Sequence, residues 1–469
     1  MPERISINPL TRISGFMEIE ADVHGGVVTD ARTEGLLFRG FELMLKDRSP
    51  FDAVYFTERI CGICSTAHAV ASSLALEDAL GIEVSEQGRY LRDVIHGCEF
   101  LQNHIRHFYQ LTVPGYVRLP EKLALFRTDN TDFRLPEKEN GAIVKSYFES
   151  LRMSRAAHEM LAVLGGKAPH NHGIFVGGAT TQANASDIIK IKSLLGEIRD
   201  FIETRMIPDV CAIARYYGEY YKIGGGYGNF LSYGCFWGYK ELGTLYVDPL
   251  TAIGGKTAPF DPADITENID YSWYEDRVDT YAPFETIARP DRQKSGGYSF
   301  IKAPRYRGFA CEVGPLARQW LSGEYRNGVS LMDRTIARVL EAKKIAEVLR
   351  ILLDNLIPGT DVQKAYEIPQ SAQGAGLVDT SRGALGHWMK IEEQKISFYQ
   401  IITPSAWNLS SQTKGLKGTA EMAMIETPVR DVGNPVELGF IVRSFDPCVS
   451  CATHVYCGEK LIKTLKVVP

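Results

Sequence analysis

The sequence contains no long uninterrupted apolar run. Its longest candidate spans Ile345 to Ile357, and charged side chains at Glu347, Arg350 and Asp354 interrupt it. Crossing a bilayer as a helix takes about 18 to 20 consecutive apolar residues. We therefore expect a chain that is soluble by itself or that a partner subunit anchors to a membrane.

An excess of positive charge is also missing. The 52 lysines and arginines are outnumbered by 57 aspartates and glutamates, which gives a formal net charge of −5. Proteins that bind nucleic acid usually present a broad positive field to the phosphate backbone, so we expect no nucleic-acid partner. The segment Met1 to Ile19 lacks the basic, apolar and small-residue order of a secretory signal, so we expect no export signal in this chain.

Cysteine is too scarce for a disulfide-stabilised fold of this size. The 469 residues include nine cysteines, and four of these form two Cys-x-x-Cys pairs. Cys61 and Cys64 lie near the N-terminus, whereas Cys448 and Cys451 lie near the C-terminus. Paired cysteines of this kind indicate metal or redox chemistry.

Apolar periodicity predicts a fold built on long helices. With 45% hydrophobic residues the chain can bury a large core, and we expect a single domain over residues 1–469. The predicted fold class is α+β and predominantly helical, with a long-helix bundle as the core. The expected helices are His68 to Leu80, Gly88 to Leu111, Ala142 to Leu164, Ser186 to Tyr217 with a kink at Pro208, and Asn327 to Leu356.

Strand signals are shorter, and they predict small peripheral β-sheets. Met17 to Val23 alternates apolar and polar side chains, His24-Gly25-Gly26 makes a turn, and Val27 to Ala31 resumes the alternation, which predicts a β-hairpin. Ile396 to Thr403 is also strand-like. Gly218 to Tyr246 and Asp248 to Arg307 show no clear period and are expected to form loops or short strands.

The two cysteine pairs can bind one metal if the chain ends meet. The loop of Cys61 and Cys64 precedes a predicted helix, whose N-terminus favours thiolate over thiol, and four thiolates suit a soft or borderline metal. A structural zinc site would use the same ligands. However, zinc ribbons usually separate their pairs by about 15 to 20 residues, whereas most of this chain lies between Cys64 and Cys448. A thioredoxin-like redox pair would leave the second pair unexplained.

The residues around both pairs resemble the signatures of nickel-iron hydrogenase large subunits. The first is Arg-Ile-Cys-Gly-Ile-Cys-x-x-x-His at Arg59 to His68, and the second is Asp-Pro-Cys-x-x-Cys-x-x-His at Asp446 to His454. The resemblance is closest to the respiratory, hydrogen-uptake branch. Further motifs in family order extend it over nearly the whole chain: Pro9 to Ile13, Phe38 to Glu42, His104 to Tyr109, Arg382 to His387 and Tyr399 to Asn408.

This resemblance implies a catalytic nickel-iron centre where both ends of the chain meet. Nickel would be bound by Cys61, Cys64, Cys448 and Cys451, and an iron that carries cyanide and carbon monoxide, Fe(CN)2(CO), would share Cys64 and Cys451. The implied reaction is the reversible heterolytic cleavage of H2 to protons and electrons. Cys448 is the implied acceptor of the proton.

Three further residues are implied to act at this centre. Arg382 matches the family arginine over the open face of the metals, although an isolated arginine more often forms a surface salt bridge. His68 would donate a hydrogen bond to a bridging sulfur, or it is a satisfied core histidine. Most of the family has Arg-Ile-Glu-Gly-His where this chain has Ser14, so the usual proton-passing carboxylate is absent and Ser14 can relay only through its hydroxyl and water. Two other departures are Asn103, where an acidic residue is usual, and Ser381, where proline is usual.

A second, harder metal site is also implied near the C-terminus. Glu42, the carbonyl of Ile401 and the side chain of His454 match the family's ligands for this ion, which is usually magnesium. Oxygen and imidazole ligands completed by water are chemically suitable for Mg2+. Without the resemblance, Glu42 would be interpreted as a solvated helix charge.

The electrons are expected to leave through a partner. The five other cysteines show no spacing that would hold an iron-sulfur cluster, so the resemblance implies a small subunit that carries such clusters. The aromatic stretch Tyr216 to Tyr246 is expected to contribute to that interface. The remaining cysteines are Cys98, Cys211, Cys235, Cys311 and Cys457.

Several other partners and one processing step are expected. A membrane anchor or an electron-acceptor subunit would receive the electrons, and a maturation endopeptidase would remove Val455 to Pro469 after nickel insertion. The compartment is either the cytoplasm or, by co-export with the small subunit, the membrane or periplasm. A respiratory complex I homologue is the main rival interpretation, but that class has lost the cysteines, whereas a hydrogen sensor would share the whole site.

Overall fold

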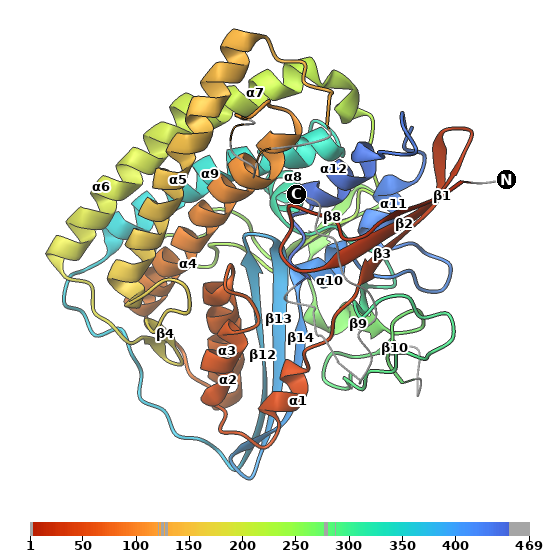
Figure 1. Ribbon diagram of the computed structural model, residues 1–469. Coiled ribbons are helices and arrows are strands. Elements are labelled where there is room, and N and C mark those ends of the chain that lie inside the picture. The colour runs from red at the N-terminus through yellow and green to blue at the C-terminus, as the bar shows by residue number, and fades with distance from the viewer. Residues whose placement is uncertain are drawn as a thin grey trace.

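Five long helices occupy the regions that apolar periodicity predicts (Figure 1). The computed structural model describes residues 3–120, 122, 126, 130–275, 280–286 and 288–449. Helices α4, α5, α6 and α9 pack together as a bundle, whereas α3 lies beside it against a β-sheet. Within these ranges, none of the helices is both long and apolar enough to cross a membrane. The bounds are α3 (Ser65–Leu80), α4 (Glu86–Arg106), α5 (Glu137–Gly165), α6 (Ala185–Phe201) and α9 (Leu331–Asn355).

Local side chains determine where these helices begin and end. The side chains of Ser85, Asn184 and Ser330 precede α4, α6 and α9, and each accepts a hydrogen bond from a first-turn backbone N–H. Gly81 ends α3 in the left-handed conformation, which glycine adopts without a steric penalty. These capping residues are readable in the sequence, which explains why the predicted helices are confirmed.

The predicted kink at Pro208 takes the form of a change in helix type. After α6 the chain forms a π-helical turn, Ile202–Met206, and then continues as α7 (Ile207–Tyr216) with Pro208 in its first turn. Proline has no backbone N–H to donate, so it is tolerated where a helix begins anew. A second π-helical turn, His107–Thr112, and a 3-10 turn, Val113–Gly115, follow α4 in the same way.

The N-terminal hairpin is confirmed and forms most of a three-stranded antiparallel sheet. Its strands are β1 (Glu3–Ile7), β2 (Met17–His24) and β3 (Val27–Gly35). Alternate residues of β2, beginning with Met17, are buried, as the pattern of the sequence predicts. The turn residues Gly25 and Gly26 both have positive φ.

A second antiparallel sheet positions α3. It consists of β12 (Ser371–Thr380), β13 (Gly383–Glu392) and β14 (Lys395–Ile402), and α3 packs on β12 (Figure 1). A Cβ atom at Gly374 or Gly376 would collide with the backbone of α3. Glycine at these two positions therefore lets the helix approach the sheet closely. Strand β14 matches the predicted strand Ile396 to Thr403, whereas no bounds were predicted for β12 and β13.

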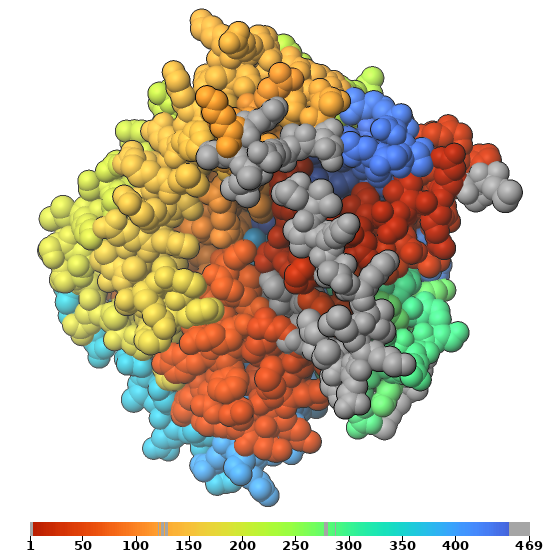
Figure 2. Space-filling model, viewed as in Figure 1, coloured from red at the N-terminus to blue at the C-terminus, as the bar shows by residue number. Residues whose placement is uncertain are grey.

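Shorter elements complete the fold. The stretches expected to be loops or short strands contain β6 to β11, as predicted. Figure 2 shows N-terminal residues in red beside C-terminal residues in blue on one face of the molecule. Helix α11 also contacts β3. The shorter elements are α1 (Phe41–Leu45), α2 (Asp52–Glu58), β4 (Ile174–Phe175), β5 (Gly178–Ala179), a 3-10 turn (Gly218–Tyr221), β6 (Phe230–Ser232), β7 (Leu250–Ile253), β8 (Lys256–Pro259), a 3-10 turn (Pro262–Asp264), β9 (Ile265–Asn268), β10 (Thr280–Tyr281), β11 (Ala303–Tyr306), α8 (Pro315–Ser322), α10 (Pro404–Asn408), α11 (Thr419–Met424) and α12 (Val436–Ser444).

Candidate metal centre

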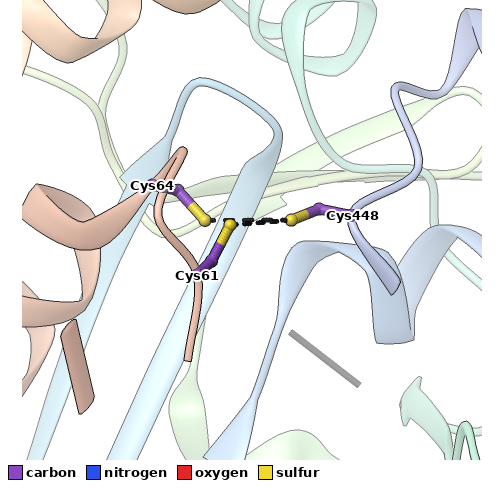
Figure 3. Close-up of side chains that lie close together, drawn as sticks. All are labelled: Cys61, Cys64 and Cys448. Atoms are coloured by element: carbon purple, nitrogen blue, oxygen red, sulfur yellow. Dashed lines mark hydrogen bonds between the residues drawn. The ribbon is translucent and has the colours of Figure 1, made fainter. Parts of the chain in front are cut away.

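Three of the four predicted cysteine ligands meet in the protein interior. Cys61 and Cys64 lie in the loop before α3, and Cys448 lies in the segment after α12, with all three side chains pointing toward one another (Figure 3). The Cys448 Sγ atom lies 3.2 Å from the Sγ of Cys61 and 4.0 Å from that of Cys64. All three sulfur atoms lie within 4.8 Å of one another and are buried. Cys451, the fourth predicted ligand, lies outside the described residues.

The two ends of the chain are held together at this point by backbone hydrogen bonds. The Ser14 N–H donates to the Pro447 carbonyl at 3.1 Å, and the Val449 N–H donates to the Ser14 carbonyl at 2.8 Å. The Cys448 N–H donates to the Ser405 hydroxyl at 3.0 Å. Ser14 therefore lies directly beside Cys448, and the predicted meeting of the chain ends is confirmed.

Arg382 lies at the turn between β12 and β13 and faces the thiols. Its side chain lines a cavity of about 10 Å³ together with Cys64 and Cys448. The Nη2 atom donates to Asn103 Oδ1 at 2.8 Å, and Nε lies 3.1 Å from both the carbonyl and the carboxylate of Asp446. Burial alone would lower the pKa of Arg382, but the charges of Asp446 and of the cysteines raise it well above its usual value. Arg382 is thus a fixed cation next to the thiols.

Asp446 is the acceptor around which the charged groups behind the thiols are arranged. Besides Arg382, it accepts a hydrogen bond from Asn103 at 2.8 Å and forms an ion pair with Arg338 at 3.2 Å. Burial by itself raises the pKa of Asp446, but the charge of Arg382, followed by those of His107 and Arg338, lowers it far below its usual value. Asp446 belongs to the predicted Asp-Pro-Cys motif, although sequence reasoning assigned it no role of its own.

The charged network continues away from the thiols. Arg338 contacts His104, whose Nε2 atom lies 2.8 Å from a carboxylate oxygen of Glu341. Glu341 in turn accepts two hydrogen bonds from Arg318, each at 2.7 Å, and Arg318 pairs with Asp379 at 3.2 Å. These groups come from α4, α8, α9 and β12, so their ion pairs and hydrogen bonds connect four separate elements around the centre.

The sequence profile of the nickel-dependent hydrogenase family matches residues 39–129, 120–328 and 322–454. The chain belongs to the nickel-dependent hydrogenase family. The periplasmic [NiFeSe] hydrogenase large subunit of Desulfomicrobium baculatum is 35% identical over 97% of this chain and 96% of that protein. The hydrogenase-1 large chain of Escherichia coli (strain K12) is 31% identical over 96% of this chain and 95% of that protein.

Solved structures show the same fold. The Ni-Fe-Se hydrogenase from D. vulgaris Hildenborough in the reduced state superposes with a TM-score of 0.93 at 36% identity, over 97% of this chain and 100% of that chain. The predicted family is confirmed, as is the α+β fold class. The nickel dependence of the family and the three clustered thiols together agree with a metal centre in this hydrogenase chain.

His68 forms part of the wall of the same cavity. Its Nδ1 atom lies 3.1 Å from the Nε2 atom of His387, and His387 Nδ1 lies 2.8 Å from the Tyr399 hydroxyl. Burial lowers the pKa of His68 to about 4, so the ring is neutral at pH 7. The structure thus gives His68 a histidine partner through Nδ1. Its predicted hydrogen bond to a bridging sulfur stays a prediction.

Glu42 and Ile401, two of the predicted ligands of the second metal site, lie close together in the hydrogenase chain. They line one pocket of about 60 Å³ with Glu267 and Lys302. Burial raises the pKa of the Glu42 carboxyl, and the charge of Lys302 acts in the opposite direction. His454, the third predicted ligand, lies outside the described residues. The pocket therefore gathers oxygen donors from three separate segments, and this donor set suits a hard cation.

Proposed function

We propose that this chain is the catalytic large subunit of a hydrogenase that interconverts H2 with protons and electrons. The observation that supports this most strongly is the cluster of three buried thiols beside Arg382 in a chain of the nickel-dependent hydrogenase family. Soft sulfur donors in a water-poor site suit nickel and a low-spin iron. We expect no such chemistry from a structural zinc site, which needs no buried cation facing its ligands.

The nickel-iron group would be held by Cys61, Cys64, Cys448 and Cys451, with Cys64 and Cys451 shared by an Fe(CN)2(CO) unit. When bound, this group supplies the redox-active Lewis acid that heterolytic cleavage of H2 requires. The donor set fits because the three described thiols already converge within 4.8 Å. Their side chains are buried, which excludes bulk water from the centre.

The chain's own residues would then handle charge and protons. Arg382 keeps a positive charge beside the thiols, and Asp446 and Asn103 hold its guanidinium in place. The Cys448 Sγ atom is the proposed first acceptor of the proton. Ser14 lies beside Cys448 through a parallel backbone bridge, so its hydroxyl is a candidate for a hydrogen-bonded relay on that side.

We also propose that the second pocket binds Mg2+. Glu42, the Ile401 carbonyl and the imidazole of His454 would hold the ion, and water would complete its coordination. The pocket shared by Glu42, Ile401 and Glu267 supports this assignment because it offers oxygen donors. The ion would tie the C-terminal residues to the N-terminal segment and so stabilise the closed centre.

The proposed partners are those that would carry electrons away from the metal centre. In the described part of the chain, the centre's own thiols are the one group of three clustered metal-binding side chains. A small subunit with iron-sulfur clusters would therefore carry the electrons to an acceptor or a membrane-anchoring subunit. A maturation endopeptidase would cut after His454 once nickel is in place.

Infrared spectroscopy of the purified complex tests this function. Bound carbon monoxide and cyanide absorb where protein groups do not, and elemental analysis of this subunit alone should find nickel and iron in equal amounts. Cys448→Ser should abolish hydrogen oxidation, whereas Cys98→Ser, at a buried cysteine outside the centre, should retain metal and activity. Zinc without nickel, or full activity in Cys448→Ser, would contradict the proposal.

A further inference from the structure

Two buried carboxylates lie behind the metal centre and take no part in the network described above. Glu99 is on α4 with 4% of its surface exposed, and Glu58 ends α2 with none exposed. An ionised carboxylate in such a place is costly unless it is paired or hydrogen-bonded. Their positions between the centre and the surface therefore need an explanation.

Glu99 lies directly behind the wall of the metal cavity. It accepts hydrogen bonds from the backbone N–H groups of Thr66 at 2.8 Å and Ala67 at 3.1 Å, in the first turn of α3 after Cys64. Ala67 itself lines the cavity that contains Cys64 and Cys448. One turn further along α4 from Glu99, Asn103 contacts Arg382, so this face of α4 points toward the centre.

Thr66 and Asn171 connect the two carboxylates. The Thr66 hydroxyl is hydrogen-bonded to Glu99. The Asn171 side-chain nitrogen donates to both Thr66 Oγ1 and Glu58 Oε1, each at 3.3 Å. These two oxygens therefore lie no further apart than twice that distance, and a proton passes between them only through an intervening water molecule.

Glu58 connects this chain of groups to the surface. One of its carboxylate oxygens lies 3.2 Å from Nη1 of Arg59, whose side chain is 46% exposed. The charge of Lys167 also acts on Glu58. The path of polar groups thus runs from the cavity wall through Glu99 and Thr66 to Glu58, and then to the exposed end of Arg59.

The acid strengths suit a carrier that must both take and release a proton. Burial raises the pKa of Glu99 to about 7, against the hydrogen bonds from Thr66 and Ala67 and the charge of Arg382. Burial raises the pKa of Glu58 to about 8, against the pairing with Arg59. In contrast, the pKa values of Asp446 and Glu341 are held far below the usual range, so those carboxylates stay ionised and cannot carry protons near neutral pH.

We propose that Glu99, Thr66 and Glu58 form the main route by which protons leave the metal centre, separate from the Ser14 hydroxyl on the other side of Cys448. The proposal depends on the proposed hydrogenase function. Glu99 takes a proton released by the protonated thiol and becomes neutral, and the Thr66 hydroxyl accepts this proton while it passes its own onward. Glu58 receives that proton and releases it to solvent beside Arg59. Each step breaks one bond to hydrogen, forms another, and moves no electron.

The test uses the assembled two-subunit enzyme and two reactions of hydrogen. Conversion of para- to ortho-hydrogen requires cleavage and recombination but no exchange with solvent, whereas formation of HD from D2 in H2O requires protons to cross the route. In Glu99→Gln and Glu58→Gln we expect HD formation to fall by about tenfold to a hundredfold, with para-ortho conversion within about twofold of the unmodified enzyme. Glu99→Asp, which restores an acid, should recover part of the loss.

Glu421→Gln is the matched control. Glu421 is also fully buried, and it accepts a hydrogen bond from the Gly418 N–H at the start of α11. Its replacement by glutamine therefore removes the same carboxylate charge at a comparable site. We expect both reactions to be unaffected there. Unchanged HD formation in the Glu99 and Glu58 variants, or an equal fall in both reactions, would overturn the proposed route. An unmodified enzyme that catalyses neither reaction would instead overturn the hydrogenase function.

Discussion

Replacing Asp446 with asparagine removes the charge that holds the groups behind the thiols together. The Asp446→Asn side chain keeps nearly the same shape, but Arg382 and Arg338 lose their shared counter-charge in the interior. Breaking a buried ion pair by removing one partner costs about 3 to 5 kcal/mol, because the remaining charge stays buried without compensation. We therefore expect a large loss of stability from a change of one charged group.

The size of the effect on the melting temperature follows from the length of the chain. Unfolding entropy is about 2.1 cal/mol/K per residue, which for 469 residues amounts to about 1 kcal/mol/K. A loss of 3 to 5 kcal/mol should thus lower the Tm by about 3 to 5 °C. Hydrogen oxidation should fall by about a hundredfold, because Arg382 would lose its counter-charge and would be held over the thiols only by the Asp446 carbonyl and Asn103.

Scanning calorimetry at a fixed scan rate, with nickel content and hydrogen oxidation measured on the same samples, provides the assay. Asp354→Asn is the control, since Asp354 pairs with Lys192 at 2.7 Å and with Arg350 at 2.9 Å on the surface, where each such pair is worth less than about 1 kcal/mol. An Asp446→Asn enzyme as stable and as active as the control would refute the reasoning.

The pH dependence gives a second check on the same residue. Because Arg382, His107 and Arg338 lower the pKa of Asp446 in the folded chain, its stabilising contribution is fully present above the unfolded pKa of about 3.9. It is lost as the pH falls below that value. The difference in Tm between the unmodified protein and Asp446→Asn should therefore be largest near pH 6 to 7 and shrink below about pH 4. A constant difference would assign the stabilisation to another cause.

Three other outcomes are expected. Ser14→Glu places a carboxylate beside Cys448 and should speed hydrogen-deuterium exchange; no gain would exclude this segment from proton transfer. Intact mass spectrometry of active protein should show an end at His454, and full-length chains with full nickel occupancy would contradict processing. Gly376→Ala should destabilise the protein by about 1 to 3 kcal/mol and lower its nickel content, because the added methyl group would collide with α3; normal stability would show that α3 can shift.

The sequence by itself determined the helices and the family. Long amphipathic stretches and capping residues such as Ser85 and Ser330 act over a few neighbouring positions, so their structural effect can be read locally. The two Cys-x-x-Cys pairs also predicted which thiols would come together, and three of these four cysteines, Cys61, Cys64 and Cys448, do so in the structure.

Only the tertiary structure decided which groups surround the thiols. Asp446 stands in the second cysteine motif, but Arg338 and Glu99 come from segments far from both cysteine pairs, and no local pattern marks these two as neighbours of the centre. Their pKa values depend on burial and on charges contributed by other elements. The same holds for β12, whose Gly376 is explained by the approach of α3 and not by strand propensity.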